Sequence, residues 1–140
     1  MLLSLSLSYL SNLNKSDTNI LATASLYHDI GRTHDGLCYV HGKNSIQKAI
    51  RLGLIGGGVN EESGILRYVV ENHCLPDNKP ESLDKYVIAD RERAMRLLWI
   101  FKDSDGLDRV RIGDLDVKYL RNAISKDLVP LANYLLKEIK

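Results

Sequence analysis

The residues of this chain best suited to chemistry are an adjacent histidine and aspartate, His28 and Asp29, in the segment 25–32 (SLYHDIGR). A neutral imidazole nitrogen and a carboxylate oxygen together suit Mn, Fe, Co, Ni or Zn better than Ca or Mg. Neighbouring side chains on a helix point about 100° apart, so both can bind one ion only off the helix end or between their two directions. Gly31 supplies a plausible helix end, and the pair is therefore half of a candidate metal site.

Further polar groups lie in two other segments. A second His-Asp pair, His34 and Asp35, falls in a loop, where it is either a solvated pair or a substrate-facing one. The acid-rich segment 102–109 (KDSDGLDR) follows a strongly apolar run, which we expect to be the central helix. All four histidines lie between residues 28 and 73, so a metal site would have to join that region to the later acids.

The elements that position these residues are predicted to be helices, because apolar residues recur at helical spacing along the chain. Ser/Leu alternation at the start would also suit a strand, but the helical pattern downstream favours a helix, paired with the next as an αα-hairpin. Ser16 or Asp17, Asn44 or Ser45, Asn60 and Asp90 are the expected N-caps. The predicted helices cover residues 3–13, 16–30, 44–54, 60–73, 90–101, 114–124 and 126–139, with a short helical turn over 82–88. The fold class is therefore all-α, a bundle of about six or seven helices.

Composition fits one intracellular domain of 140 residues. Hydrophobic content of 44%, with 26% charged residues, is ordinary for a soluble globular protein, and a net charge of +1 gives no global reason to bind nucleic acid or an anionic membrane. The apolar start lacks a basic segment and a cleavage site, and it is too short to span a bilayer. Cys38 and Cys74 form no CxxC motif, so we expect reduced thiols and a cytoplasmic protein, although a disulfide between them stays open.

Four segments together resemble the HD-domain superfamily of metal-dependent phosphohydrolases. They are residues 27–32 (YHDIGR), residues 41–45 (HGKNS), His73 at a predicted helix end and residues 102–111 (KDSDGLDRVR). The resemblance covers roughly residues 2–120 and implies a single HD-like domain over 1–140. In that family a helical bundle holds a divalent ion through a histidine, the His-Asp pair and a later aspartate.

Carried over residue by residue, the resemblance implies that His28, Asp29 and Asp105 bind the metal and that Asp29 or Asp105 orients the attacking water. His41 and His73 match positions that bind a second metal or the phosphate in some branches. The alternatives are an exposed histidine at a helix start for His41, a histidine favouring the helix dipole for His73, and an ordinary polar helix end for Asp105.

Other charged residues receive lesser roles. Asp103 and Asp108 are expected to be structural acids or partners of the ligands. Four cations are candidates for neutralising a substrate phosphate, with solvated surface charge as the alternative for each. These four are Arg32, Lys43, Arg109 and Arg111.

The chain departs from the family pattern at its start. Family members usually supply a first metal-binding histidine several turns before the His-Asp pair, whereas no histidine precedes His28 here. We therefore expect either an N-terminally truncated chain or a shortened relative with an incomplete site. Loss of those first turns would leave apolar core surface uncovered, and a homodimer through the N-terminal helix is one expected consequence.

The resemblance predicts a metal-dependent phosphohydrolase acting on a nucleotide or another small phosphate ester. The alternative is a degenerate HD fold without turnover that serves as a ligand-binding or interaction module. A nucleic-acid binder using Arg91, Arg93 and Arg96 is weaker, because acids interleave with these arginines. No GxxxxGK[ST] or strand-bounded GxGxxG motif supports ATP-driven or NAD-dependent chemistry.

Overall fold

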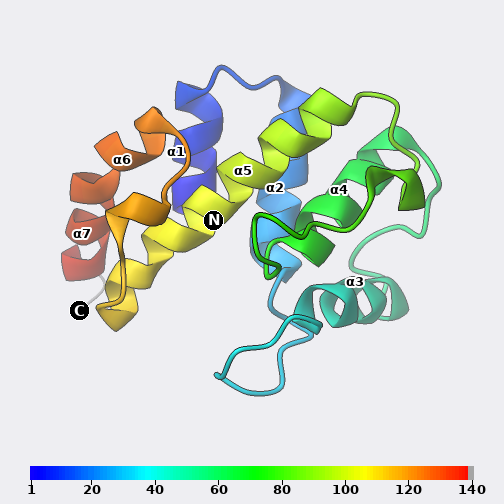
Figure 1. The fold of residues 1–140 in the computed structure, drawn as a ribbon, viewed down its shortest axis with the longest axis horizontal. Helices are drawn as coiled ribbons and strands as arrows, with labels where there is room; N and C mark the ends of the chain where they lie inside the picture. Colours follow the sequence, from blue (N-terminus) through cyan, green and yellow to red (C-terminus); the bar gives the residue numbers. More distant parts are fainter. Residues whose placement is uncertain (139–140) are drawn as a thin grey trace.

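The structure is a computed structural model that describes residues 1–138, and Figure 1 shows an arrangement built from helices alone. The α-helices are α1 (Leu2–Leu10), α2 (Lys15–Tyr27), α3 (His41–Arg51), α4 (Glu61–Asn72), α5 (Arg91–Asp108), α6 (Ala123–Asp127) and α7 (Val129–Glu138). Three 3-10 helices accompany them, η1 (Leu83–Lys85), η2 (Arg109–Ile112) and η3 (Val117–Tyr119). No strand occurs in the described part of the chain. The predicted all-α bundle of about seven helices is confirmed.

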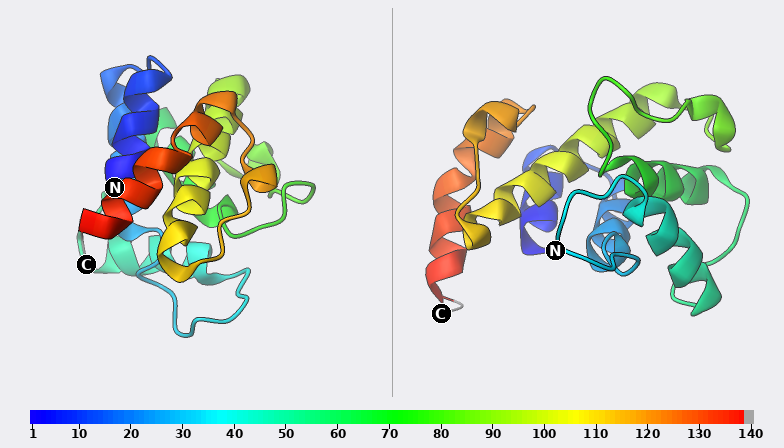
Figure 2. Two further views of the ribbon diagram at one scale, coloured as in Figure 1. Left: turned by 90° about the vertical axis from the view of Figure 1, so that its left-hand side faces the viewer. Right: turned by 60° about the horizontal axis from the view of Figure 1, so that its bottom comes forward.

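The longest helix, α5, crosses the molecule and contacts α1, α2, α4, α6 and α7, as the views in Figures 1 and 2 show. Its apolar side chains, among them Leu97, Leu98 and Phe101, are almost completely buried. The acids follow its buried apolar run as predicted, but the predicted helix end at residue 101 is wrong, because α5 continues to Asp108 and these acids occupy its last turns. Asp103 is tolerated there because backbone N–H groups of a later segment hydrogen-bond its carboxylate.

The helices α1 and α2 form the expected hairpin. Leu3 and Leu7 of α1 are buried, and this helix packs against α2 and α5. Leu2 and Tyr9 stay exposed on its outer side. The predicted homodimer through this helix stays a prediction.

Two predicted N-caps are confirmed and two are wrong. Asn60 and Asp90 cap α4 and α5 through their side chains. The cap of α2 is Asn14, whose Oδ1 accepts from the Asp17 N–H at 2.9 Å, while the Asp17 carboxylate is buried against Arg93. The helix α3 begins at His41, ahead of the predicted cap at residues 44–45.

The predicted C-terminal helices are broken into shorter pieces. Residues 114–124 form η3 and the start of α6 instead of one helix, and the expected turn over 82–88 is only the 3-10 helix η1. Pro130 lies in the first turn of α7, where its missing N–H has no helical partner to lose. Ile139, assigned to the core face of the last helix, lies outside the described residues.

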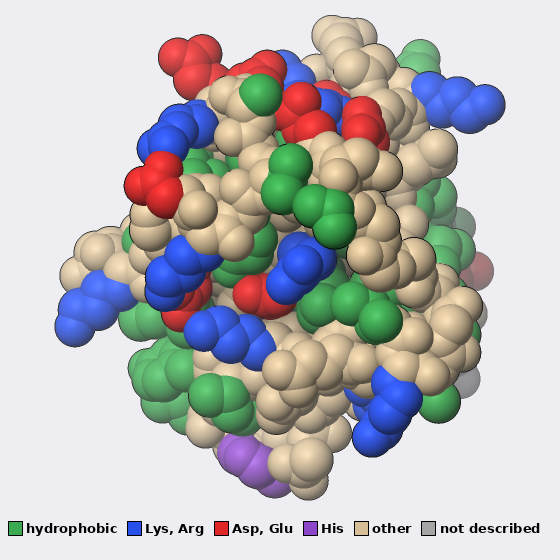
Figure 3. All heavy atoms as spheres, turned by 90° about the vertical axis from the view of Figure 1, so that its right-hand side faces the viewer, with side chains coloured by type: hydrophobic (Ala, Val, Ile, Leu, Met, Phe, Trp, Pro, Cys, Tyr) green, Lys and Arg blue, Asp and Glu red, His purple; other side chains and the backbone are tan. Residues whose placement is uncertain are grey.

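No helix within residues 1–138 is long and apolar enough to span a bilayer. Figure 3 shows the end of the molecule formed by α3, α4 and the segments that follow them. Acidic, basic and hydrophobic side chains are mixed on this face. Both cysteines are free thiols.

Candidate metal centre

Five of the predicted site residues come together where α2, α3, α4 and α5 meet. His28 is the C-cap of α2, His41 is the first residue of α3, and His73 is the C-cap of α4. Asp29 lies in the turn after α2, and Asp105 lies in the last turns of α5. Helix ends leave the side chains free to converge, so the fold gathers residues from distant parts of the sequence at one place.

The turn that carries the His-Asp pair is held against α3. The Ser45 hydroxyl donates to the His28 carbonyl at 2.5 Å and accepts from the Gly31 N–H at 2.9 Å. A Cβ atom on Gly31 would overlap the backbone of Asn44 and Ser45, so this close approach requires glycine. Ser45 is thus bonded to the turn instead of capping α3, which explains why the predicted cap is wrong.

The buried rings of His41 and His73 have their tautomers fixed by backbone carbonyls. His41 Nδ1 lies 2.7 Å from the Cys38 oxygen, and His73 Nδ1 lies 2.6 Å from the Val70 oxygen. A carbonyl oxygen can only accept, so each Nδ1 carries the hydrogen. In the neutral rings both Nε2 atoms are therefore acceptors, and they face each other at 2.9 Å.

The Asp29 carboxylate adds further acceptors to the same place. Its Oδ1 lies 3.2 Å from His41 Nε2 and 3.8 Å from His73 Nε2. This Oδ1 is buried and has no hydrogen-bond partner within residues 1–138. Three atoms that offer only lone pairs thus point at one another, which is unfavourable unless a positive charge lies among them.

The other half of the cluster is built around His28. Its Nε2 lies 3.6 Å from Asp29 Oδ2 and 3.5 Å from Asp105 Oδ1. Its Nδ1 is buried and also lacks a partner within the described chain. Asp29 therefore connects both halves, with Oδ1 toward His41 and His73 and Oδ2 toward His28.

Protonation within the cluster follows from these contacts. Contact with the His73 imidazole, followed by the charges of nearby histidines, lowers the pKa of Asp29 to about 2 against the effect of partial burial. Burial and the neighbouring His73 lower the pKa of His41, which keeps its ring neutral and able to bind a cation. Burial opposes the charge on His28, but the Asp105 and Asp29 carboxylates outweigh it and raise the pKa of His28.

The residues present fit a divalent ion. With bonds of about 2.1 Å, two ligands of one ion lie about 3.0 Å apart at octahedral angles and about 3.4 Å apart at tetrahedral angles. The separations of 2.9 to 3.8 Å in this cluster span that range. Phe101 lies edge-on to both His28 and His73 and supplies an apolar wall. Imidazole and carboxylate donors favour Mn, Fe, Co, Ni or Zn.

Three of the four predicted phosphate-binding cations lie beside the cluster. A hollow of about 460 Å³ is lined by Asp29, Arg32, Asp35, Asp105, Asp108, Arg109, Arg111 and Ile112. Arg109 pairs with Asp114, and Arg111 pairs with Asp108 at 2.6 Å. Lys43 does not line this hollow, because its Nζ binds Glu81 Oε1 at 2.7 Å.

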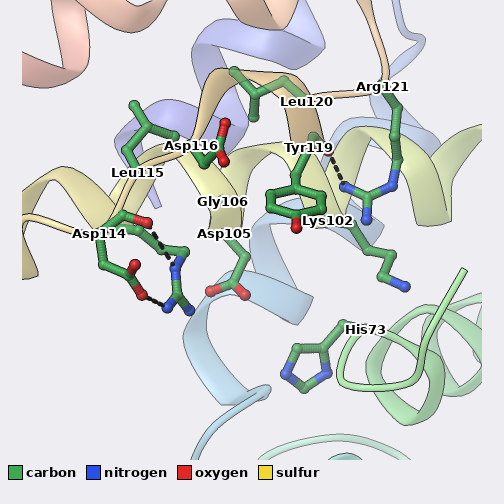
Figure 4. Close-up of a pocket in the computed structure, with 11 residues that line it drawn as sticks. His73, Lys102, Asp105, Gly106, Asp114, Leu115, Asp116, Tyr119, Leu120 and Arg121 are labelled. Carbon is green, nitrogen blue, oxygen red and sulfur yellow. Dashed lines mark hydrogen bonds and ion pairs between the residues drawn. The ribbon is translucent and has the colours of Figure 1, made fainter.

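A second pocket, of about 420 Å³, opens on the other side of Asp105 (Figure 4). His73 lies at its lower edge, and the Tyr119 ring and the Lys102 side chain project into the same view. The sequence analysis missed Lys102, Tyr119 and Arg121 as pocket residues. Lys102 was expected after the end of the central helix, whereas the structure buries it within α5, where its Nζ donates to Leu75 and Asp77.

The remaining acids and histidine have structural or exposed positions. Asp103 is completely buried and accepts from Arg121 and Asn122, as expected of a structural acid. Asp108 is an exposed partner of Arg111. His34 accepts from the Gly36 N–H at 3.2 Å in an exposed loop.

Cys74 is a further residue that the sequence did not mark for this site. Its thiol sulfur lies within 4.8 Å of ligand nitrogens of His41 and His73. Its Sγ donates to the Tyr39 carbonyl at 3.4 Å, and burial raises its pKa. In this arrangement the thiol stays protonated and adds no charge to the cluster.

No family model, curated protein or solved structure was found to match this chain.

Proposed function

We propose that this chain is a metal-dependent phosphohydrolase of the HD type, acting on a nucleotide or another small phosphate ester. The observation that supports it is the meeting of His28, Asp29, His41, His73 and Asp105 at one place, with Asp29 Oδ1 and the Nε2 atoms of His41 and His73 turned toward one another. A cation would relieve the opposition of these lone pairs, and a divalent ion would also polarise a phosphoryl oxygen and lower the pKa of a bound water.

The charges around the cluster make the ion necessary for substrate binding. The hollow beside Asp29 has four acidic residues and three arginines among its lining residues. Without an ion this lining has a small net negative charge that repels phosphate, whereas a dication reverses the sign. Arg109 and Arg111 are half exposed, so exchanging their own acids for a substrate phosphate costs little.

Each side of the cluster has a distinct task in the proposed reaction. Arg32, Arg109 and Arg111 bind the phosphate oxygens, and Asp29 or Asp105 orients the attacking water by accepting a hydrogen bond from it. The pocket beside Tyr119 and Lys102 has room for the group that leaves with the ester oxygen. Lys43 is bound to Glu81 outside the hollow, so it contacts the substrate only if the substrate extends beyond the hollow.

The experiment is a metal analysis combined with phosphatase assays on Asp29→Asn and on a matched control, Asp127→Asn, which changes an exposed acid of α6. We expect about one or two Mn, Fe, Co, Ni or Zn ions per chain. Hydrolysis of a general phosphate ester should fall by at least a hundredfold in Asp29→Asn. A metal-free protein that stays inert with added Mn would instead support the ligand-binding or interaction module.

A further inference from the structure

A separate pocket of about 500 Å³ lies between the turn after α2 and the outer side of α3. Its lining residues are Ile30, Gly31, Arg32, Thr33, Asn44, Gln47, Lys48 and Arg51. Three of them are cations and none is acidic. The whole chain is nearly neutral, with a net charge of +1, so this local excess is not a consequence of a basic composition.

The helix α3 supplies most of the polar lining through one stripe of its surface. Asn44, Gln47, Lys48 and Arg51 are spaced three, four and seven residues apart and therefore share a helix face. All four are exposed, whereas Ile46 on another face of the helix is buried in the core. The stripe is thus free to meet a ligand from solvent.

The donors along this stripe are mostly unused. Within residues 1–138, no ion pair joins Lys48 or Arg51 to an acid, and the side chains of Asn44 and Gln47 make no hydrogen bond. Most other cations near the metal cluster are already paired, as Lys43 is with Glu81. Lys48 uses one of its three donors on the Ile30 carbonyl, at 2.8 Å, which holds its Nζ at the edge of the pocket.

Arg32 lies between this pocket and the hollow beside the metal cluster, because it lines both. Its Nη1 lies 3.7 Å from Asp29 Oδ2, and its Nε and Nη2 donate to carbonyls of residues 34–36. These contacts hold the Arg32 guanidinium on the side of the hollow beside Asp29, where it belongs to the proposed metal centre. Lys48 and Arg51 are the cations left to bind an anion in the pocket.

We propose that this pocket binds a small phosphorylated ligand, with Lys48 and Arg51 on the phosphate oxygens and with Thr33, Asn44 and Gln47 as neutral donors. Phosphate fits better than a single carboxylate, because its three or more oxygens match several donors and a guanidinium grips two of them. The volume suits a ligand of the size of a di- or triphosphate. This site is distinct from the proposed metal centre and does not require it.

The test uses inorganic pyrophosphate as the probe and protein freed of metal by chelation and desalting, so that the His/Asp cluster holds no cation. Binding is followed by calorimetry and by amide chemical shifts. We expect binding of one pyrophosphate per chain at low salt, weaker at high salt, with the largest shifts in residues 44–51.

Arg51→Gln is the main variant, since this side chain makes no hydrogen bond within the described chain and its loss leaves the fold intact. It should weaken binding about fivefold, and Lys48→Gln combined with it should abolish binding. Arg67→Gln, an exposed arginine of α4 paired with Glu71, is the matched control and should bind as the parent does.

Three outcomes overturn the proposal. They are no binding at millimolar pyrophosphate, unchanged binding in the Lys48/Arg51 double variant, or loss of binding in Arg109→Gln with retention in Arg51→Gln. The last would place the anion beside the cluster. Because the protein is metal-free, a failure here says nothing about hydrolysis, and failure of the hydrolase proposal leaves this site standing.

Discussion

Two polar clusters near the end of α5 differ in how their hydrogen-bonding groups are matched. Around Asp103, which is completely buried, every acceptor has a donor: the N–H groups of Arg121 and Asn122 lie 2.8 to 3.1 Å away. Arg121 in turn binds both Asp77 oxygens at 2.8 Å, and Lys102 binds Asp77 at 2.7 Å. Asp105, two residues further along the same helix, belongs to the His/Asp cluster. In that cluster Asp29 Oδ1 and the Nε2 atoms of His41 and His73 face one another without a donor.

The difference separates a structural cluster from a binding one. A satisfied buried network stabilises the fold and has nothing left to offer a ligand. In the His/Asp cluster, by contrast, Asp29 Oδ1 and the Nε2 atoms of His41 and His73 face one another without a donor, and a bound cation would relieve this opposition. The following predictions compare the two clusters, starting with the largest effect.

Asp103→Ala removes the acceptor from the satisfied network. It leaves Arg121 and two backbone N–H groups without their partner, so the free energy of unfolding should fall by about 3 kcal/mol or more. Urea denaturation measures this loss. The exposed Asp127→Ala should change stability by less than about 0.5 kcal/mol, and an equally small change in Asp103→Ala would contradict the structural role.

Divalent metal should stabilise the protein through the other cluster. At a free concentration 100 times the dissociation constant, a bound ion adds about 2.7 kcal/mol to the free energy of unfolding. Thermal unfolding with and without Mn or Zn measures the gain. His73→Ala should lose it, and a gain that persists in His73→Ala would show that the metal binds elsewhere.

The pH dependence should differ between metal-free and metal-loaded protein. In the metal-free protein, the raised pKa of His28 gives stability that is present below its ordinary value of 6.5 and is lost as the pH rises through the folded-state pKa. Asp29, with its pKa lowered from 3.8 to about 2, contributes stability above pH 3.8 that is lost as the pH falls toward 2.

Metal reverses the histidine contribution, because the imidazoles must be deprotonated to bind it. The metal-dependent gain in stability should therefore shrink as the pH falls below about 6.5. Unfolding curves between pH 5 and about 8, with and without metal, test this. Parallel curves would argue against histidine ligands.

Asp29→Asn should have the smallest effect on the metal-free fold. It removes the attraction of the carboxylate to the nearby histidines, but the new amide can donate to the histidine Nε2 atoms. The two effects offset each other, so stability should change by less than about 1 kcal/mol in either direction. The same variant should lose the metal-dependent gain. A loss as large as that of Asp103→Ala would mean that the carboxylate is structural.

The sequence predicted the helices well where local chemistry decides. Asn60 and Asp90 are caps because their side chains reach the nearby N–H groups of their own helices. The predicted end of α5 was too early. The groups that hydrogen-bond Asp103 come from residues 121–122, and no local sequence pattern reveals them. The predicted start of α3 was too late, again because of a contact with a distant segment. The Ser45 hydroxyl hydrogen-bonds to the turn after α2 instead of capping the helix.

The candidate site was predictable in its members and not in its geometry. The pattern named His28, Asp29, His41, His73 and Asp105, and the fold brings them together. The spacing of these residues in the sequence did not reveal that their lone pairs face one another, or that Lys43 pairs with Glu81. Both features depend on how separate helices pack.

The hydrogen bond between His41 Nδ1 and the Cys38 carbonyl has a consequence for how this chain can vary. The ring is oriented by a backbone atom, so the side chain at position 38 is open to substitution without a change of tautomer. The loop before α3 should tolerate changes in its length less well than changes in its sequence. A one-residue deletion within 33–37 would shift that carbonyl and release the ring, so natural or engineered length changes here should be far less tolerated than sequence changes.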